Sequence, residues 1–233
     1  MTENANSGRL YIVSTPIGNL EDITLRALRV LKEADLIAAE DTRHTRILLN
    51  HYQISTRLIS YHAFNEHRKT AELLDQINSG MKVAVVSDAG TPGIADPGFL
   101  FVREAVKAGI EPEIIPGVSS LTFAAVASGL PIDKFIFYGF LPVKSGRRGE
   151  AIKQIAAETK TCVIFESPHR MEKLLNEISA GLGAETPVAV VREATKMFEE
   201  VIRGHVSEVI QKTSGRKWKG ECVLAVSPCS AIE

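Results

Sequence analysis

The sequence predicts an α/β protein made of two α/β lobes of similar size, with a ligand cleft between them. Short apolar runs rich in β-branched residues alternate with segments of helical periodicity, a pattern typical of sheets covered by helices on both faces. A Pro-Gly pair at 116–117 interrupts this alternation near the middle of the 233 residues. We therefore expect an N-terminal α/β domain over residues 1–116 and a C-terminal α/β domain over residues 117–233.

The composition is that of an ordinary globular protein. Hydrophobic residues make up 45% of the chain and charged residues 24%, and the formal net charge is −1. This balance excludes a global attraction to polyanions, so any nucleic-acid surface has to be a local patch. No apolar run is long enough to cross a membrane, and the polar first eight residues lack a signal-peptide core. We expect a cytoplasmic protein with a disordered N-terminal tail and no membrane partner.

The cysteines give no sign of a metal site. Cys162, Cys222 and Cys229 show no C-x-x-C spacing and no accompanying histidine cluster. Cys162 and Cys222 lie in apolar runs that resemble strands, so we expect buried thiols, consistent with a reducing compartment. We expect no bound metal.

One stretch, Val83–Gly98, organises the N-terminal half. Its first four residues form a β-branched run that suits a strand buried on both faces, and ten small or turn-forming residues follow. Ligand sites of open α/β sheets form at the carboxyl ends of the strands, where glycines such as Gly90 let the backbone approach a ligand closely. The alternative is a plain connection that ends in a helix cap at Asp96. Connections of this kind are usually much shorter, which favours a ligand loop.

The other elements of the N-terminal half follow from the same patterns. Thr42 and Asn65 are expected to cap two of the helices, and Gly80 to stop the second of them. Expected strands cover residues 9–14, 36–39, 57–61, 83–86 and 112–115, and expected helices cover 22–34, a segment after Thr42, 65–78 and 98–108.

The C-terminal half is expected to begin with a buried helix of small residues. This helix covers 118–128 and carries Ser119 and Ser120 in its first turn. A polar basic loop is expected over 141–149, and an edge strand at 199–202 is expected to pair across Arg203-Gly204. The remaining expectations are strands at 134–138, 161–165, 187–191 and 220–226, the last closing the sheet, and helices at 150–158, 171–178 and up to 212.

Three polar clusters stand directly after expected strands. They are Glu40-Asp41-Thr42-Arg43, Glu166-Ser167-Pro168-His169-Arg170 and Arg192-Glu193-Ala194-Thr195-Lys196. Each mixes carboxylates with cations, so ion pairing is the structural alternative to catalysis. Because strand ends face the ligand site in such sheets, we expect Glu40 and Asp41 to be functional. Asp41 and His169 are the favoured proton acceptors, although the residues alone do not select one base.

Eight motifs stand in the order and approximate spacing of one known family. They are LYIVSTPIGNLEDIT, AAEDTRHTR, VSDAGTPGIADPG, IPGVSS, GFLP, FESPHR, VVREATK and KGE, and they extend from about Arg9 to Val226. The chain resembles the tetrapyrrole methylase superfamily and, within it, the ribosomal RNA small subunit methyltransferase I branch. The resemblance implies two α/β lobes of the tetrapyrrole-methylase type with a cofactor cleft between them. Members of this branch usually carry a further small C-terminal helical domain, and we expect this chain to be without one.

The resemblance also implies an activity and its participants. The cofactor is S-adenosylmethionine (SAM), the substrate is the ribose 2′-hydroxyl of a cytidine in the decoding region of small-subunit ribosomal RNA, and the enzyme is a homodimer. Some of the residues expected to face the cofactor belong to the glycine-rich loop after Val86, and the others match cofactor contacts of the family. Together they are Ile17, Asp88, Gly90, Ile94, Ala95, Ser119, Ser120, Phe165, Glu193 and Glu221. Expected RNA contacts are Arg43, Arg147, Arg148, Lys217 and Lys219 on phosphates, with the lone Trp218 stacking a base.

Two other functions remain open from the sequence. The first is a methyltransferase of the same superfamily that acts on carbon atoms of a tetrapyrrole, although the EDTR, SDAGTP and ESPHR motifs favour the RNA branch. The second is a non-catalytic ribosome-binding protein that retains the fold without cofactor affinity. SAM binding would separate this last possibility from both enzymes.

Overall fold

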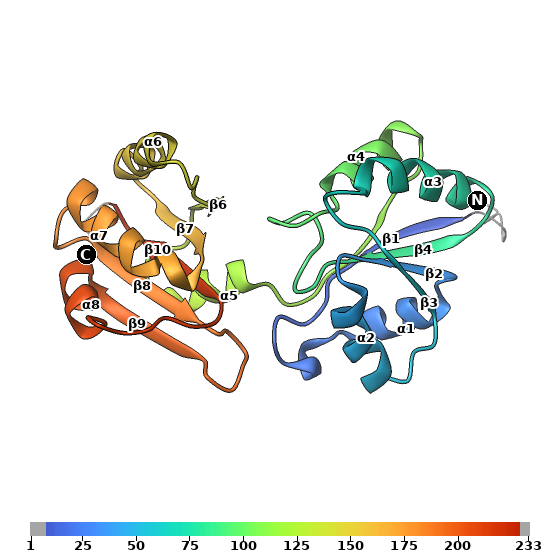
Figure 1. Ribbon diagram of the computed structural model, residues 1–233, viewed down its shortest axis with the longest axis horizontal. Helices are drawn as coiled ribbons and strands as arrows, with labels where there is room; N and C mark the ends of the chain where they lie inside the picture. Colours follow the sequence, from blue (N-terminus) through green and yellow to red (C-terminus); the bar gives the residue numbers. More distant parts are fainter. Residues whose placement is uncertain (1–7, 229–233) are drawn as a thin grey trace. The chain divides into compact units, whose positions relative to one another are not determined.

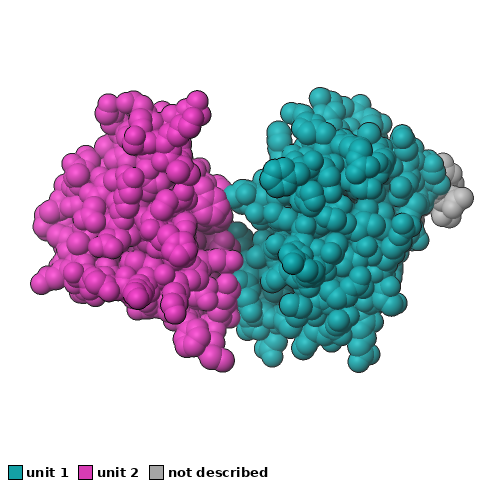
Figure 2. Space-filling view, in the orientation of Figure 1, with its two compact units in different colours: residues 1–119 teal, residues 120–233 magenta. Residues whose placement is uncertain are grey.

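The computed structural model describes residues 8–228 and divides the chain into two compact units, residues 1–119 and 120–233 (Figure 2). This division falls after Ser119, three residues beyond the domain boundary expected after residue 116. Residues 1–7, which hold most of the expected N-terminal tail, and Cys229 lie outside the described residues.

The first unit is organised around a five-stranded parallel sheet (Figure 1). The strand order is β3-β2-β4-β1-β5, so the strand of the organising stretch lies in the middle. Its residues Val83–Val86 are buried, which explains why the sequence shows a continuous apolar run in place of an alternating one. The strands are β1 (Arg9–Val13), β2 (Leu36–Ala39), β3 (Arg57–Ser60), β4 (Lys82–Val86) and β5 (Glu113–Ile115).

Helices cover both faces of this sheet. One core layer joins α1 and α2 to the sheet through side chains such as Leu31 and Leu49, and the opposite layer joins α3 and α4 through Leu73 and Phe101. The elements are η1 (Leu20–Asp22), α1 (Leu25–Glu33), α2 (Thr42–His51), α3 (Glu66–Asn78) and α4 (Phe99–Lys107).

The caps of these helices correct three expectations. The residues expected at 22–34 split into η1 and α1, because the Thr24 side chain caps α1 by accepting from the Ala27 backbone N–H. Asp41, and not Thr42, caps α2. The residue before α4 is Gly98, and not Asp96.

The second unit contains a mixed five-stranded sheet. Its order is β6-β7-β10-β8-β9, in which only the β6–β7 pair is parallel. The strand expected to close the sheet, β10, lies in its centre, with every residue buried. The strands are β6 (Phe135–Phe140), β7 (Thr161–Glu166), β8 (Pro187–Arg192), β9 (Glu200–His205) and β10 (Cys222–Val226), and the helices are α5 (Ser120–Ser128), α6 (Ser145–Ala156), η2 (Pro168–Arg170), α7 (Met171–Leu182) and α8 (Val206–Lys212).

Three expectations for the second unit are wrong. The expected basic loop over 141–149 ends early, because α6 already begins at Ser145. Arg203 and Gly204 lie inside β9, which pairs with β8, so the turn precedes β9. Helix α5 is only partly buried, since Val126 is 71% exposed.

The expectation for the described cysteines is confirmed. Cys162 and Cys222 are free and buried, and burial raises the pKa of Cys162 to about 12 and that of Cys222 to about 11. Among the described residues, no group of three or more His, Cys, Asp or Glu side chains is placed to hold a metal ion. None of the described helices is long and apolar enough to cross a membrane.

Candidate active site

The carboxyl edge of the first sheet carries the polar loops that the sequence singles out. Because all five strands are parallel, their carboxyl ends meet at this one edge. The segments after β1 and β4 are joined there by two backbone hydrogen bonds, from Thr15 N to Gly90 O (2.8 Å) and from Gly90 N to Thr15 O (3.1 Å). The Ser14 and Thr91 hydroxyls are also 2.8 Å apart. The loop after β4 is therefore fixed to the end of β1.

Gly90 is the residue on which this loop geometry depends. It is buried with φ of +76°, a backbone conformation that side-chain-bearing residues rarely adopt. An added Cβ would lie 3.5 Å from Cγ2 of Ile17, which is itself only 5% exposed. Farther along the loop, Ile94 is 43% exposed and Ala95 has φ of +63°. The loop thus combines a fixed backbone with an exposed apolar side chain, and residues 88–95 contain no Lys or Arg.

Asp88 and Asp41 connect the ends of β4 and β2. The Asp41 backbone N–H donates to Oδ1 of Asp88 over 3.0 Å. The Asp41 carboxylate accepts from the Arg43 backbone N–H (2.8 Å) and from Nη2 of Arg43 (2.7 Å). These Arg43 hydrogen bonds hold the pKa of Asp41 well below its usual range. Asp41 is therefore a helix cap and an ion-pair partner, and the expectation that it acts as a general base does not fit its environment.

Glu40 has the opposite environment. It is half-buried, and burial, followed by the neighbouring charge of Asp88, raises its pKa. A carboxylate with a raised pKa is a better proton acceptor than Asp41. Of the two expected acidic residues, Glu40 therefore has the environment that better suits a proton acceptor.

His62 is a polar residue at this edge that the sequence reasoning missed. It follows β3, and its Nε2 lies 3.3 Å from Nδ2 of Asn65. Its Nδ1 is buried and has no hydrogen-bond partner among residues 8–228. The rule that led to Glu40, a polar side chain directly after a strand of the parallel sheet, would also have found His62.

The second unit shows that part of the ESPHR motif is structural. The Glu166 side chain is completely buried and accepts from Arg148 Nη2 and Arg170 Nη2, each over 2.7 Å. Arg148 is 2% exposed and also donates to Glu177 over 2.6 Å. The expectation that Arg148 contacts RNA is wrong, because its guanidinium is used inside the protein. His169, in η2, is exposed.

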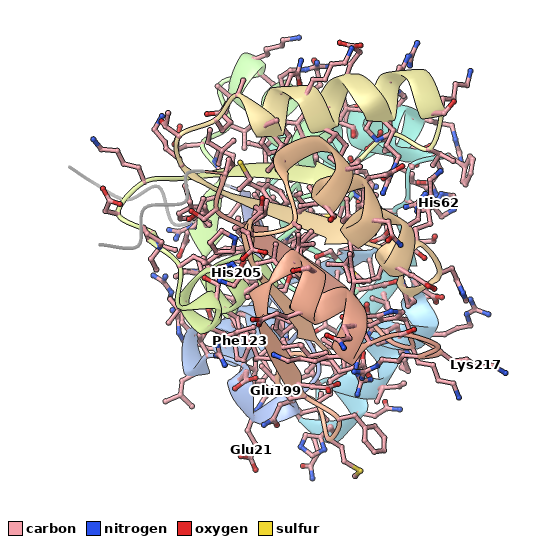
Figure 3. The ribbon with its side chains drawn as sticks, turned by 90° about the vertical axis from the view of Figure 1, so that its left-hand side faces the viewer. Glu21, His62, Phe123, Glu199, His205 and Lys217 are labelled. Atoms are coloured by element: carbon pink, nitrogen blue, oxygen red, sulfur yellow. The ribbon has the colours of Figure 1, made fainter. Side chains whose placement is uncertain are left out.

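The basic segment before β10 needs a similar correction. Trp218 is 7% exposed and packs into the core of the second unit, and the Arg216 guanidinium lies 4.7 Å from its ring centre. Trp218 is therefore not available to stack a base. Arg147, Lys217 and Lys219 are exposed, and Figure 3 shows the Lys217 side chain pointing away from the ribbon.

Glu193 follows β8 and Glu221 precedes β10. The two residues lie side by side at the same end of these paired strands. The Glu193 N–H donates to Glu221 O over 2.9 Å, and the Glu221 N–H donates to Oε1 of Glu193 over 3.0 Å. Lys196 bridges both carboxylates, at 3.0 and 3.1 Å. Ion pairing thus accounts for much of the VVREATK motif.

The other residues expected to face the cofactor divide between the units. Phe165, in β7, is partly exposed and packs against Phe137 and Phe140, with ring centres 4.8 and 5.7 Å away. Ser120 is the first residue of α5, and Ser119 precedes it as the last residue of the first unit. The structure brings Ile17, Glu40, Asp41, Arg43, Asp88 and Gly90 together at the edge of the first sheet.

Comparison with known proteins decides the family. Residues 9–210 match the family of tetrapyrrole (corrin/porphyrin) methylases. A ribosomal RNA small subunit methyltransferase I from Halalkalibacterium halodurans is 45% identical over 221 residues, covering 95% of this chain and 76% of the relative. One of the same description from Thermotoga maritima is 47% identical over 220 residues, covering 94% and 98%.

The chain belongs to the ribosomal RNA small subunit methyltransferase I family. The Thermotoga relative shows that members differ in length, because this chain covers nearly all of it. A solved uroporphyrin-III C-methyltransferase from Thermus thermophilus, complexed with S-adenyl homocysteine, shares the fold. It aligns with a TM-score of 0.65 at 20% identity and covers 95% of this chain and 98% of its own. The expected tetrapyrrole-methylase fold is confirmed.

Adjacent arginines test the structural role of the buried ion pairs. Replacing Arg148 with Met would leave the Glu166 carboxylate buried with only Arg170 as a cationic partner. We expect a loss of about 3–5 kcal/mol in the free energy of unfolding, as for other broken buried pairs. Urea denaturation of the full chain measures the change, with the fluorescence of Trp218 reporting the unfolding of the second unit. The matched Arg147→Met variant alters an exposed residue and should stay within about 0.5 kcal/mol of the wild type. Equal stability of the two variants would contradict the assigned ion pair.

Proposed function

We propose that this protein transfers a methyl group from SAM to the ribose 2′-hydroxyl of a cytidine in the decoding region of small-subunit ribosomal RNA. The observation that carries this proposal is the identity of 45–47% to two ribosomal RNA small subunit methyltransferases I over nearly the whole chain. The ribose position and the cytidine come from the motif resemblance.

The loop after β4 suits SAM as the cofactor. SAM carries an amino acid, a ribose and an adenine, so it needs hydrogen bonds and shape complementarity in place of phosphate-binding charge. The fixed backbone at Gly90, the exposed Ile94 and the lack of cations over 88–95 meet this need. When bound, SAM supplies an electrophilic methyl group. We propose that residues of the first unit hold it, namely Ile17, Asp88, Gly90, Ile94, Ala95 and Ser119. For Ser120, Phe165, Glu193 and Glu221, in the second unit, a cofactor contact stays a prediction from the motif resemblance.

The ribose hydroxyl is a weak nucleophile, so its proton has to be removed as it attacks. We propose that Glu40 accepts this proton, because its environment raises its pKa. Asp41 keeps a structural role, since its carboxylate is held by Arg43. His169, which is exposed, is the alternative base. The chain otherwise aligns the donor and the acceptor and excludes water.

RNA contacts in the second unit are proposed for Arg147, Lys217 and Lys219. All three are exposed, and a local patch is what a nearly neutral protein requires to hold a polyanion. The homodimer and the cytoplasmic location stay predictions from the sequence.

Methyl transfer to defined acceptors tests the proposed function. We expect wild-type protein to label assembled small ribosomal subunits with radioactive methyl from SAM, more readily than extracted RNA, because the particle presents the target in a fixed geometry. Nuclease digestion and nucleoside mass spectrometry should place the label on a cytidine ribose. Label on a base, or on a tetrapyrrole offered in competition, would overturn the proposal. Absence of SAM binding in calorimetry would favour the non-catalytic ribosome-binding alternative.

Two glycines of the first unit test the cofactor loop. Gly90 and Gly109 have nearly the same φ, +76° and +77°, so valine strains the backbone similarly at both. Only Gly90 lies in the loop, whereas a Cβ at Gly109 would meet nothing within 4 Å. We expect Gly90→Val to weaken SAM binding about tenfold or more, which is about 1.4 kcal/mol, with Gly109→Val near wild type. Calorimetry measures both. Equal SAM affinity in the two variants would show that the loop does not bind the cofactor.

The two neighbouring carboxylates test the base. Glu40→Gln should lower kcat by about 10²–10⁴-fold with unchanged SAM affinity, because the proton acceptor is lost. In the wild type, kcat should fall as the pH decreases through the raised pKa of Glu40, since only the carboxylate form accepts a proton. Asp41→Asn keeps a capping oxygen and the proton acceptor, so kcat should still fall at low pH, but at a lower pH than in the wild type, because the Asp41 charge helps to raise the pKa of Glu40. A Glu40→Gln enzyme with normal kcat, or with the wild-type pH profile, would eliminate Glu40 and leave His169.

A further inference from the structure

Phe64 is the most exposed large hydrophobic residue of the described chain. Its side chain is 99% exposed, and its ring packs edge-on against His62, with ring centres 6.0 Å apart. The turn that carries it is held by hydrogen bonds, from His62 N to Asn65 Oδ1 (2.9 Å) and from Asn65 Nδ2 to Ser60 O (3.4 Å). Tyr61, at the start of the turn, is 1% exposed. The protein thus holds an aromatic ring out into solvent on an ordered turn, although burying a Phe side chain typically gains about 1.5–3 kcal/mol.

Helix α2, which begins at the same edge of the sheet, is cationic. Every ionisable residue in it is basic, namely Arg43, His44, Arg46 and His51. Arg43 and Arg46 are exposed and, being three residues apart, lie on the same side of the helix. Arg43 forms an ion pair with Asp41, whereas Arg46 forms no ion pair with any residue between 8 and 228. An unpaired exposed arginine favours an anionic partner.

The sheet brings the turn and the first residues of α2 to the same edge, because β2 and β3 both end there. Strands β2 and β3 are parallel neighbours, and the Tyr61 N–H donates to Ala39 O over 2.7 Å. The chain leaves β2 through Glu40 into α2, and it leaves β3 into the turn with His62 and Phe64. His62, labelled in Figure 3, is close enough to Glu40 to influence the pKa of that carboxyl. The exposed ring and the exposed cations therefore lie at the same edge of the first sheet as the proposed proton acceptor.

We propose that Phe64, Arg43 and Arg46 form a binding surface for a single-stranded segment of the RNA substrate. A base stacks on the Phe64 ring, and the phosphates of the same strand lie against Arg46 and Arg43. This combination of an aromatic platform and cations is how proteins hold unpaired nucleotides, and stacking tolerates any base because each has a π-face. This surface takes the role that the sequence had suggested for Trp218. The inference rests on the proposed function, since it supplies the RNA contact beside Glu40.

Substitutions at Phe64 separate stacking from simple apolar contact. We expect Phe64→Leu to raise the Kd for a fluorescein-labelled single-stranded oligocytidine about 5- to 150-fold, and to raise KM for assembled small subunits, with unchanged SAM affinity. Phe64→Trp should keep or improve binding, because it retains an aromatic face. The control is Phe198→Leu, which alters another exposed phenylalanine and should bind as the wild type does. Arg46→Gln should lower the slope of log Kd against log salt by about 0.7, the value for one phosphate contact to a single strand.

The other outcomes are also informative. Unchanged oligocytidine affinity in Phe64→Leu would overturn the surface, as would an equal loss in Phe64→Leu and Phe64→Trp. An effect on KM for subunits without any effect on the oligonucleotide would point to a ribosomal protein as the partner and would also overturn it. If the wild type binds oligocytidine through Phe64 but methylates no RNA, the surface stands and the proposed function fails.

Discussion

The parallel pairing of β4 with β1 and β2 is the constraint on which the candidate site depends. Parallel strands require crossover connections, so helices must cover both faces of the sheet, and every strand must end at the same edge. The polar residues after β1, β2, β3 and β4 therefore meet although they are far apart in the sequence. The bridge between Thr15 and Gly90 and the Asp41–Asp88 hydrogen bond are local consequences of this pairing.

The first unit was largely predictable because its strands carry strong local signals. Leu36–Ala39 is a strand as expected, since a short apolar run between charged segments leaves little choice. The second unit was less predictable because distant contacts override local propensity there. Two glycines in SGRRGE argue against a helix, yet α6 begins at Ser145, where Arg148 reaches Glu166 and Glu177. The central place of β10 is equally invisible, because pairing order depends on the whole sheet.

The candidate site was predictable by position but not by role. The rule for strand ends identified Glu40, Asp41 and Asp88, but only the structure shows that Arg43 holds Asp41, while burial and then the charge of Asp88 raise the pKa of Glu40. Charge also misled at Arg148, which the sequence places in a basic segment and the fold places in the core. Trp218 was misjudged similarly, because its neighbours are basic while its own ring packs inward. Phe64 has no pattern around it, so its exposure had to be seen in the structure.

The central position of β10 has a consequence for how the chain folds during synthesis. All five strands of the first unit have left the ribosome once Ile115 has emerged, so this unit can fold early. The second sheet remains in two halves, β6–β7 and β8–β9, until Cys222–Val226 is made. During that interval β7 and β8 each present an unpaired inner edge, which is prone to pair with another chain. The second unit is therefore the part of the nascent protein that most needs protection from aggregation.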